Sequence, residues 1–263
     1  MKFLFLCLIL NALSYSAFSA EDLLSEIVSR KEIRIGMEAG YIPFEMKNKK
    51  GGLIGFDVDL AKILAKEMGV KVKFINTEWD GIIPALLTKK FDLIMSGMTV
   101  TQKRNLKVNF ATPYIIVGQT ILLNKKLKGK IKNYRQLNSS KYNVISKLGT
   151  TGEQAVKKLL PNAKYRAYQT EQEAALEIMS GKADAFVYDH PYNSIFVNAK
   201  GKGKVIHLST PFTHEPIGMA LRKSDPNFLN FLNNFISQVK NDGRYDKLYQ
   251  KWFKGDKWLS QIK

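Results

Sequence analysis

The sequence is poor in cysteine. Among its 263 residues only Cys7 is a cysteine, and it lies within an apolar N-terminal stretch. A chain without that stretch would hold neither a thiol nor a disulfide, so its stability would come from a hydrophobic core. The composition therefore excludes a small disulfide-stapled domain. The roughly 240 residues beyond the stretch suffice for one large or two modest domains.

Long apolar runs are also scarce. The run over residues 3–10 is too short to span a bilayer, which takes about 20 apolar residues, and no later run reaches that length. Lys2 before this run and the mostly small residues at 16–20 after it are typical of a secretory signal over residues 1–20. We expect cleavage near Ser19 or Ala20 and export of a soluble mature protein.

Acidic residues are in the minority. The chain has 23 Asp and Glu against 41 Lys and Arg, a formal net charge of +18. The lysines are scattered, and no arginine-rich arm, zinc-ligand spacing or aromatic RNA-binding motif accompanies them, so we expect no nucleic-acid partner. The densest cluster, residues 125–132, alternates with leucine, isoleucine and glycine and indicates an exposed connection with at most a weak contact to anionic surfaces.

Histidine is rare as well. The three histidines, His190, His207 and His214, have no metal-ligand spacing with one another or with acids. We therefore expect no metal site, and nothing in the sequence indicates a cofactor.

The most informative stretch runs from Asp92 to Arg104. Residues 93–95 form an apolar run of strand length, Gly97 permits close backbone approach, and Thr101 can cap a helix with Arg104 in its first turn. The N–H groups at a helix start and a guanidinium both favour a carboxylate. The stretch predicts a carboxylate receptor. From this stretch alone the alternative stays open that Arg104 is a surface residue placed unfavourably against its own helix dipole.

Strand and helix patterns alternate around this stretch. One series covers residues 32–113, with Asp57 as the expected N-cap of a helix, and a second begins at residue 142 and includes a capping box at Thr170 and Glu173. Strand, helix, strand, helix in this order predicts parallel sheets with covering helices. Both series carry a Gly/Thr turn after a strand, where open parallel sheets bind ligands. We expect an α/β protein of two lobes with a ligand between them.

Several motifs carry a resemblance to a known family. They are found at residues 40–44, 55–59, 79–86, 97–99 with Arg104, 149–150, 183–185, 242–243 and 251–253. With them, essentially the whole mature chain resembles the periplasmic solute-binding proteins of amino-acid ABC importers, the group that includes glutamine-, lysine/arginine/ornithine- and cystine-binding proteins. The resemblance implies a type II two-lobed fold with mostly parallel sheets.

The resemblance also implies limits for the lobes. The first lobe would take residues 21–113 and 218–263, and the second would take residues 119–212. Crossings at about 114–118 and 213–217 would form the hinge. The implied location is the periplasm.

The resemblance further implies roles for individual residues. Tyr41 and Trp79 match aromatic walls, although either could be a core aromatic. Asp189 matches the ammonium partner, although it could instead cap the helix that follows it. The remaining matches are first-lobe contacts to the ligand's α-groups and second-lobe carboxylate donors: Ser96, Gly97, Thr99 and Arg104 in the first lobe, and Thr150 and Thr151 in the second.

The ligand's side chain is left to Glu38 and Lys147. Glu38 alone would favour a basic amino acid, unless it is a solvated loop acid. If Lys147 reaches Glu38, the charges cancel, and a neutral polar side chain could bridge the two. Lysine at this turn matches glutamine binders, so the sequence favours a polar neutral ligand slightly over a basic one.

The predicted function is capture of a polar L-amino acid and delivery to a membrane-embedded ABC permease by a monomer. A sensor or a surface-displayed binding protein could use the same pocket. A dehydratase-type enzyme on this scaffold would need a general acid with a raised pKa in the cleft. The sequence offers only Glu38 and Glu45 as loop acids for that role, so we expect no enzyme.

Overall fold

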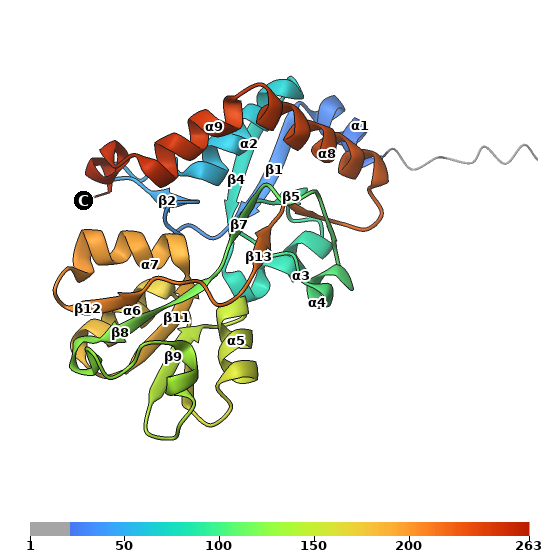
Figure 1. Ribbon diagram of the computed structural model, residues 1–263. Helices are drawn as coiled ribbons and strands as arrows, with labels where there is room; N and C mark the ends of the chain where they lie inside the picture. The colour runs from blue at the N-terminus through green and yellow to red at the C-terminus, as the bar shows by residue number, and fades with distance from the viewer. Residues whose placement is uncertain (1–21, 263) are drawn as a thin grey trace, which may run out of the picture.

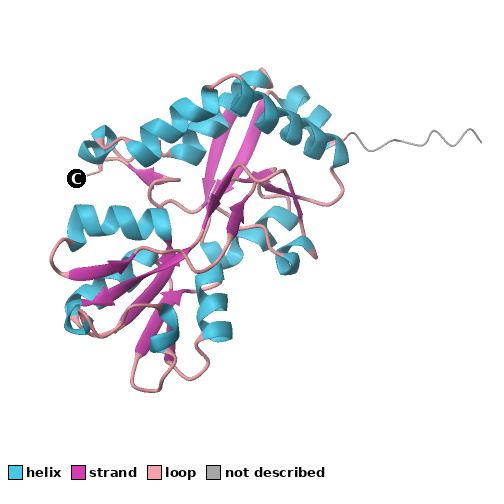
Figure 2. Ribbon diagram, viewed as in Figure 1, coloured by secondary structure: helices cyan, strands magenta, loops and turns pink. Residues whose placement is uncertain are grey.

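Two β-sheets, each covered by helices, form two lobes in the computed structural model, which describes residues 22–262 (Figure 1). Figure 2 shows the strands in two separate groups with helices around each. The expected signal over residues 1–20 and its cleavage site lie outside the described residues. No helix among residues 22–262 has the length and apolar character that crossing a membrane would require.

The first sheet has the order β4-β1-β5-β14-β6, and β14 runs against the other four strands. Its strands are β1 (Glu32–Met37), β4 (Lys71–Asn76), β5 (Leu93–Ile94), β6 (Asn109–Phe110) and β14 (Ala220–Leu221). The same lobe contains α1 (Leu23–Arg30), α2 (Phe56–Glu67), α3 (Ile82–Leu87), α4 (Gln102–Asn105), α8 (Pro226–Asn241), α9 (Arg244–Tyr249) and the hairpin of β2 (Met46–Lys47) and β3 (Leu53–Ile54). Since α8 contacts α1 and α9 contacts α2, this lobe joins the two ends of the described chain.

The second sheet has the order β10-β9-β11-β8-β12, and here β8 is the reversed strand. Its strands are β8 (Gln119–Asn124), β9 (Asn143–Lys147), β10 (Lys164–Tyr168), β11 (Ala185–Asp189) and β12 (Val205–Leu208), and its helices are α5 (Thr151–Leu159), α6 (Glu171–Ser180) and α7 (His190–Phe196). Four strands of each sheet share one direction, so the prediction of mostly parallel sheets is confirmed.

Two extended crossings connect the lobes. They are β7 (Ile115–Val117) and β13 (Glu215–Ile217), which pair antiparallel and lie side by side between the lobes in Figure 1. Short 3-10 turns lie at Trp79–Gly81, Lys125–Leu127, Tyr134–Leu137 and Lys257–Gln261, and single π-helical turns at Val197–Gly201 and Gln250–Lys254. The chain thus passes twice between the sheets, through one two-stranded ribbon.

Helix α6 follows the local sequence signals. The Thr170 side chain accepts a hydrogen bond from the Glu173 backbone N–H, and the Glu173 side chain accepts one from the Thr170 N–H. Gly181 ends the helix with a left-handed φ of 84°. The predicted capping box is therefore confirmed. It places Glu171 in the first turn of the helix, beside the end of β10.

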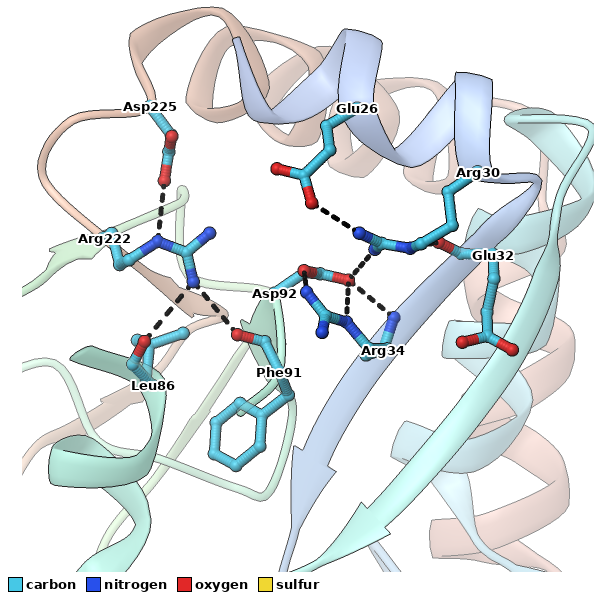
Figure 3. Close-up of polar contacts among 9 residues, drawn as sticks. All are labelled: Glu26, Arg30, Glu32, Arg34, Leu86, Phe91, Asp92, Arg222 and Asp225. Carbon is cyan, nitrogen blue, oxygen red and sulfur yellow. Dashed lines mark hydrogen bonds and ion pairs between the residues drawn. The ribbon is translucent and has the colours of Figure 1, made fainter. Parts of the chain in front are cut away.

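An ion-pair cluster ties α1, β1 and β5 together (Figure 3). The Asp92 carboxylate is fully buried and accepts hydrogen bonds from Arg30 Nη2 at 2.5 Å, from Arg34 Nη2 at 2.7 Å and from the Arg34 backbone N–H at 2.8 Å. Figure 3 also shows Arg222 donating to the carbonyl oxygens of Leu86 and Phe91. These contacts fix the start of the strand that leads into the turn at residues 96–99.

The buried carboxylate of Asp57 binds the backbone of the turn at residues 96–99. Gly97 has a left-handed φ of 53°, and its N–H donates to Asp57 Oδ2 at 2.8 Å. The Tyr114 hydroxyl donates to the same carboxylate at 2.8 Å. The expectation that Asp57 caps α2 is wrong, because the helix begins at Phe56 after the N-cap Gly55 and the Asp57 side chain points to the turn instead.

We expect Asp92→Ala to lower the free energy of unfolding by about 2–4 kcal/mol. Truncating one member of a buried ion pair leaves its partners uncompensated, and the partial exposure of Arg30 and Arg34 moderates the loss. Urea denaturation followed by circular dichroism measures it. Glu26→Ala is the control, since its exposed pair with Arg30 should contribute less than about 1 kcal/mol. Equal losses in the two variants would contradict a structural role for Asp92.

We expect Gly97→Ala to lower stability by about 2–4 kcal/mol, because the left-handed backbone disfavours a side chain and overpacking adds strain. An added Cβ would lie 2.2 Å from Cε1 of Tyr41. Gly81→Ala is the matched control, with φ of −94° and no heavy atom within 4 Å of the added Cβ. The same urea titration decides, and a Gly97→Ala variant as stable as Gly81→Ala would contradict the packing described here.

Candidate functional site

A cavity lies between the lobes, and its side chains leave a volume of about 20 Å³ for water-sized atoms. All eleven residues predicted from the sequence line it, so the structure brings the whole predicted set together. They are Glu38, Tyr41, Trp79, Ser96, Gly97, Thr99 and Arg104 from the first lobe and Lys147, Thr150, Thr151 and Asp189 from the second. Glu45 and Tyr188 also line the cavity, and the sequence had not assigned either as a ligand contact.

Arg104 is a buried cation at one end of the cavity. Thr101 caps α4 through the Arg104 N–H, as predicted, and the guanidinium donates to the carbonyl oxygens of Thr99 at 2.7 Å and Gly149 at 3.3 Å. No ion pair among residues 22–262 involves Arg104. Burial lowers its pKa to about 10. Arg104 is therefore no surface residue, and an anion entering the cavity would find an unpaired positive charge.

Trp79 and the start of α5 complete this end. The Trp79 ring lies 5.3 Å from Cζ of Arg104, and its Nε1 donates to the Gly149 carbonyl at 3.1 Å. Thr150 caps α5 by accepting from the Glu153 N–H, so the helix begins at the cavity wall with Thr151. The first N–H groups of a helix lack partners within it and favour an anion. Both lobes can thus contribute donors to one carboxylate.

Asp189 is a buried carboxyl group in the same cavity. The Tyr41 hydroxyl donates to its Oδ2, and Gln119 Nε2 donates to its Oδ1 at 2.5 Å. Burial raises the pKa of Asp189 to about 7, although the hydrogen bond from Tyr41 works against this. Asp189 occupies the N-cap position of α7, but its side chain makes no capping hydrogen bond there and bonds to Tyr41 and Gln119 instead. Its position and charge suit an ammonium group.

Lys147 lies between two acids in the cavity, with its Nζ 6.0 Å from the centre of the Trp79 ring. Its Nζ contacts Glu38 and lies 2.7 Å from Glu171 Oε2. Burial lowers the pKa of Lys147, but Glu171 and Glu38 together raise it above its usual value. Burial raises the pKa of Glu38 despite the attraction of Lys147. The predicted approach of Lys147 to Glu38 occurs, with a second carboxylate that the sequence analysis had not considered.

Two polar residues were missed by the sequence reasoning, Glu171 and Gln119. Strand order could have predicted the position of Glu171. The strands β9 and β10 are parallel neighbours, and Tyr168 at the end of β10 pairs with Lys147 at the end of β9. The helix that follows β10 therefore begins at the same edge of the sheet as Lys147. Gln119 gave no such signal, because it lies at the start of the reversed strand β8.

The hydrogen bonds of the cavity cross from one lobe to the other. Tyr41 reaches Asp189, Trp79 and Arg104 both reach Gly149, and Glu38 reaches Lys147. The lobes are therefore in contact around the cavity, in a closed arrangement.

The histidines lie elsewhere. The rings of His190 and His207 are 5.6 Å apart, and His207 Nε2 lies 3.0 Å from the Thr120 hydroxyl. Among residues 22–262 no cluster of three His, Cys, Asp or Glu side chains could hold a metal ion.

The chain is similar to binding proteins of ABC transporters. L-cystine-binding protein TcyJ of Escherichia coli K12 is 30% identical over 244 residues, which cover 93% of this chain and 91% of that protein. A crystal structure described as a candidate binding component of an ABC transporter from Wolinella succinogenes DSM 1740, complexed with lysine, is 53% identical, with a TM-score of 0.85 over 88% of this chain and 99% of that one.

A second structure, the ancestral amino acid-binding protein AncCDT-1, a precursor of cyclohexadienyl dehydratase, is 51% identical, with a TM-score of 0.83 over 88% of this chain and 99% of that one. The predicted two-lobed fold is thereby confirmed. The family model of the bacterial extracellular solute-binding proteins, family 3, matches residues 33–255. Because this match spans most of the sequence, the chain belongs to that family of solute-binding proteins.

Proposed function

We propose that the protein captures a cationic L-amino acid, lysine or arginine, between its lobes and delivers it to an ABC permease. The observation that carries this proposal is the charge distribution of the cavity. It offers one cation to a carboxylate, one anion to an ammonium group, and an excess of negative charge at the end left for a side chain.

The α-groups account for the first two charges. A zwitterion can enter a buried cavity only where both of its charges are met, because an unpaired buried charge is strongly unfavourable. Arg104 and the start of α5 would bind the carboxylate, and Asp189 would bind the ammonium group. Arg104 and Asp189 come from different lobes, so an amino acid that binds both would stabilise closure.

The side-chain end favours a cation. The charges of Glu38, Glu171 and Lys147 are −1, −1 and +1, and their sum is −1. From Glu38 and Lys147 alone the sequence favoured a neutral polar ligand, because those two charges cancel. Glu171 shifts this preference towards a basic one. The bound lysine of the Wolinella structure supports the same reading.

For the lobe limits, the location and the partner, we propose what the sequence predicted. The lobes would have the limits 21–113 with 218–263 and 119–212, and they would rotate about β7 and β13. We propose a periplasmic monomer with a membrane-embedded permease as its partner. A sensor or a surface-displayed protein would use the same cavity, and a permease gene beside the coding sequence would distinguish the importer component.

One observation favours a second candidate, a dehydratase-type enzyme. Glu45 lines the cavity, and burial followed by repulsion from Asp57 raises its pKa well above the usual value, as a general acid requires. The similar AncCDT-1 is described as a precursor of such an enzyme but itself as an amino acid-binding protein. Turnover of a cyclohexadienyl acid by the purified protein would favour the enzyme over the binding protein that we propose.

Arg104→Ala should weaken lysine binding by about 2–5 kcal/mol of binding free energy, which would abolish measurable binding. The ligand carboxylate would then be buried without its cation. Calorimetric titration with lysine measures the loss, and circular dichroism checks the fold. Arg244→Ala is the control, since its ion pairs with Glu67 and Asp242 lie outside the cavity and binding should not change. Near wild-type affinity of Arg104→Ala would contradict the assignment.

Glu171→Gln should change the ligand preference. The charge sum at the side-chain end becomes zero, so lysine binding should weaken relative to glutamine binding by roughly tenfold or more, the size of about one charge-assisted hydrogen bond. Competition titrations of lysine and glutamine give the ratio. Glu173→Gln in the same helix keeps the capping box and should leave the ratio unchanged. An unchanged ratio in Glu171→Gln would show that this acid does not select the side chain.

A further inference from the structure

Glu45 has a carboxyl oxygen without a partner. The side chain is fully buried, and its Oε1 accepts a hydrogen bond from the Ser96 hydroxyl at 2.5 Å. Ser96 in turn accepts the N–H of Glu38 at 3.0 Å, so this edge of the carboxyl group is fixed. Oε2 has no hydrogen-bond partner among the described residues. Because Glu45 lines the cavity, a group that enters the cavity can reach it.

An unpartnered buried oxygen is unfavourable in either protonation state. Ionised, it would be a buried charge without a counterion, and protonated, it would be a donor without an acceptor. Burial first and the neighbouring Asp57 second raise the pKa of Glu45 well above its usual value, so the protonated form is favoured while the cavity is empty. A hydrogen-bond donor on a ligand in the cavity would supply the partner that Oε2 lacks.

We propose that Glu45 Oε2 binds the side-chain cation of the ligand and that Glu45 releases its proton to solvent when this cation arrives. The inference rests on the proposed function, because it requires a cationic ligand, and it adds both a specificity-determining residue and a proton linkage. A neutral amide could hydrogen-bond to the protonated carboxyl group and would release nothing.

The groups around Glu45 fit this assignment. Lys147 and Glu171 act on it across the cavity, and Asp57 acts on it from α2. The nearby hydroxyl groups are already engaged, since Tyr41 donates to Asp189 and Tyr114 donates to Asp57. Glu38 adjoins Glu45 through Ser96. Lys147 is already engaged by two acids, whereas both oxygens of Asp57 have donors. Within this group, Glu45 Oε2 is therefore the fully buried acceptor that lacks a donor among residues 22–262.

Asp189 must be separated from this effect. Its pKa of about 7 in the closed cavity means that a ligand ammonium group would also displace a proton from it. Every α-amino acid carries that ammonium group, so the contribution of Asp189 is common to lysine and glutamine. The difference in proton release between the two amino acids therefore removes the contribution of Asp189. Burial also raises the pKa of Glu38, so the Glu45→Gln variant is needed to assign that difference to Glu45.

The sign of the linkage follows from the proton count. The unliganded protein binds one more proton at Glu45 than the lysine complex does, so lysine affinity rises with pH between the lowered pKa of the complex and the raised pKa of the free protein. The slope from one group is at most about tenfold per pH unit. Glutamine affinity should lack this additional slope.

The test is calorimetric titration in two buffers of different ionisation enthalpy at neutral pH. Wild-type protein should release up to one proton more with lysine than with glutamine. In Glu45→Gln the difference should vanish, and lysine affinity should fall roughly tenfold to hundredfold with the loss of a charge-assisted hydrogen bond. Glu173→Gln, an exposed change in α6, should behave as the wild type.

Equal proton release with the two amino acids in the wild type, or a persistent difference in Glu45→Gln, would overturn the assignment of Glu45 while leaving cationic-ligand capture intact. Failure of lysine and arginine to bind the wild type would overturn the proposed function, and this inference with it. If Glu45→Gln does not fold, equal proton release with lysine and glutamine in the wild type still overturns the assignment.

Discussion

The site depends on Arg104, a buried guanidinium that has no carboxylate partner among residues 22–262. Arg104 donates to carbonyl oxygens from both lobes, which hold its position but do not neutralise its charge. Such a group is stable only where the surrounding structure is fixed and an anion can complete it. The cap at Thr101, the turn at Gly97 and the carboxylate of Asp57 beneath that turn provide the fixed surroundings. The ligand would provide the anion.

Side chains that line the cavity make hydrogen bonds to one another that a ligand would otherwise make. Tyr41 bonds to Asp189, and Lys147 bonds to Glu38, so groups that would meet the ligand meet one another across the closed cavity. A ligand has to replace these hydrogen bonds with better ones, and its net gain is smaller than the sum of its own contacts. Selectivity benefits, since a ligand that leaves one of these charged groups without a partner loses more than it gains.

Local signals in the sequence carried most of the fold and much of the site. The caps at Thr101 and Thr170 and the strand-end turns depend on neighbours within a few residues, so they could be predicted. Asp57 misled the prediction because a capping residue and a buried acceptor have the same side chain, and only the tertiary position of Gly97 distinguishes them. Strand pairing brings Glu171 to Lys147 and Gln119 to Asp189, and residue spacing alone does not contain that pairing.

If the lobes rotate as proposed, the paired crossings β7 and β13 limit how they can move. Since Glu215 to Ile217 pair with Val117 to Ile115, the crossings form a two-stranded ribbon and cannot twist independently. Rotation is then concentrated where the ribbon ends, and at Gly118 an added Cβ would lie 2.5 Å from the Thr213 carbonyl oxygen. A ribbon of this kind leaves the lobes one main direction of rotation, described by a single opening angle. In the proposed importer, a ligand side chain of the wrong length would stop closure at a different angle, and a permease could then distinguish a wrongly filled protein by its shape alone.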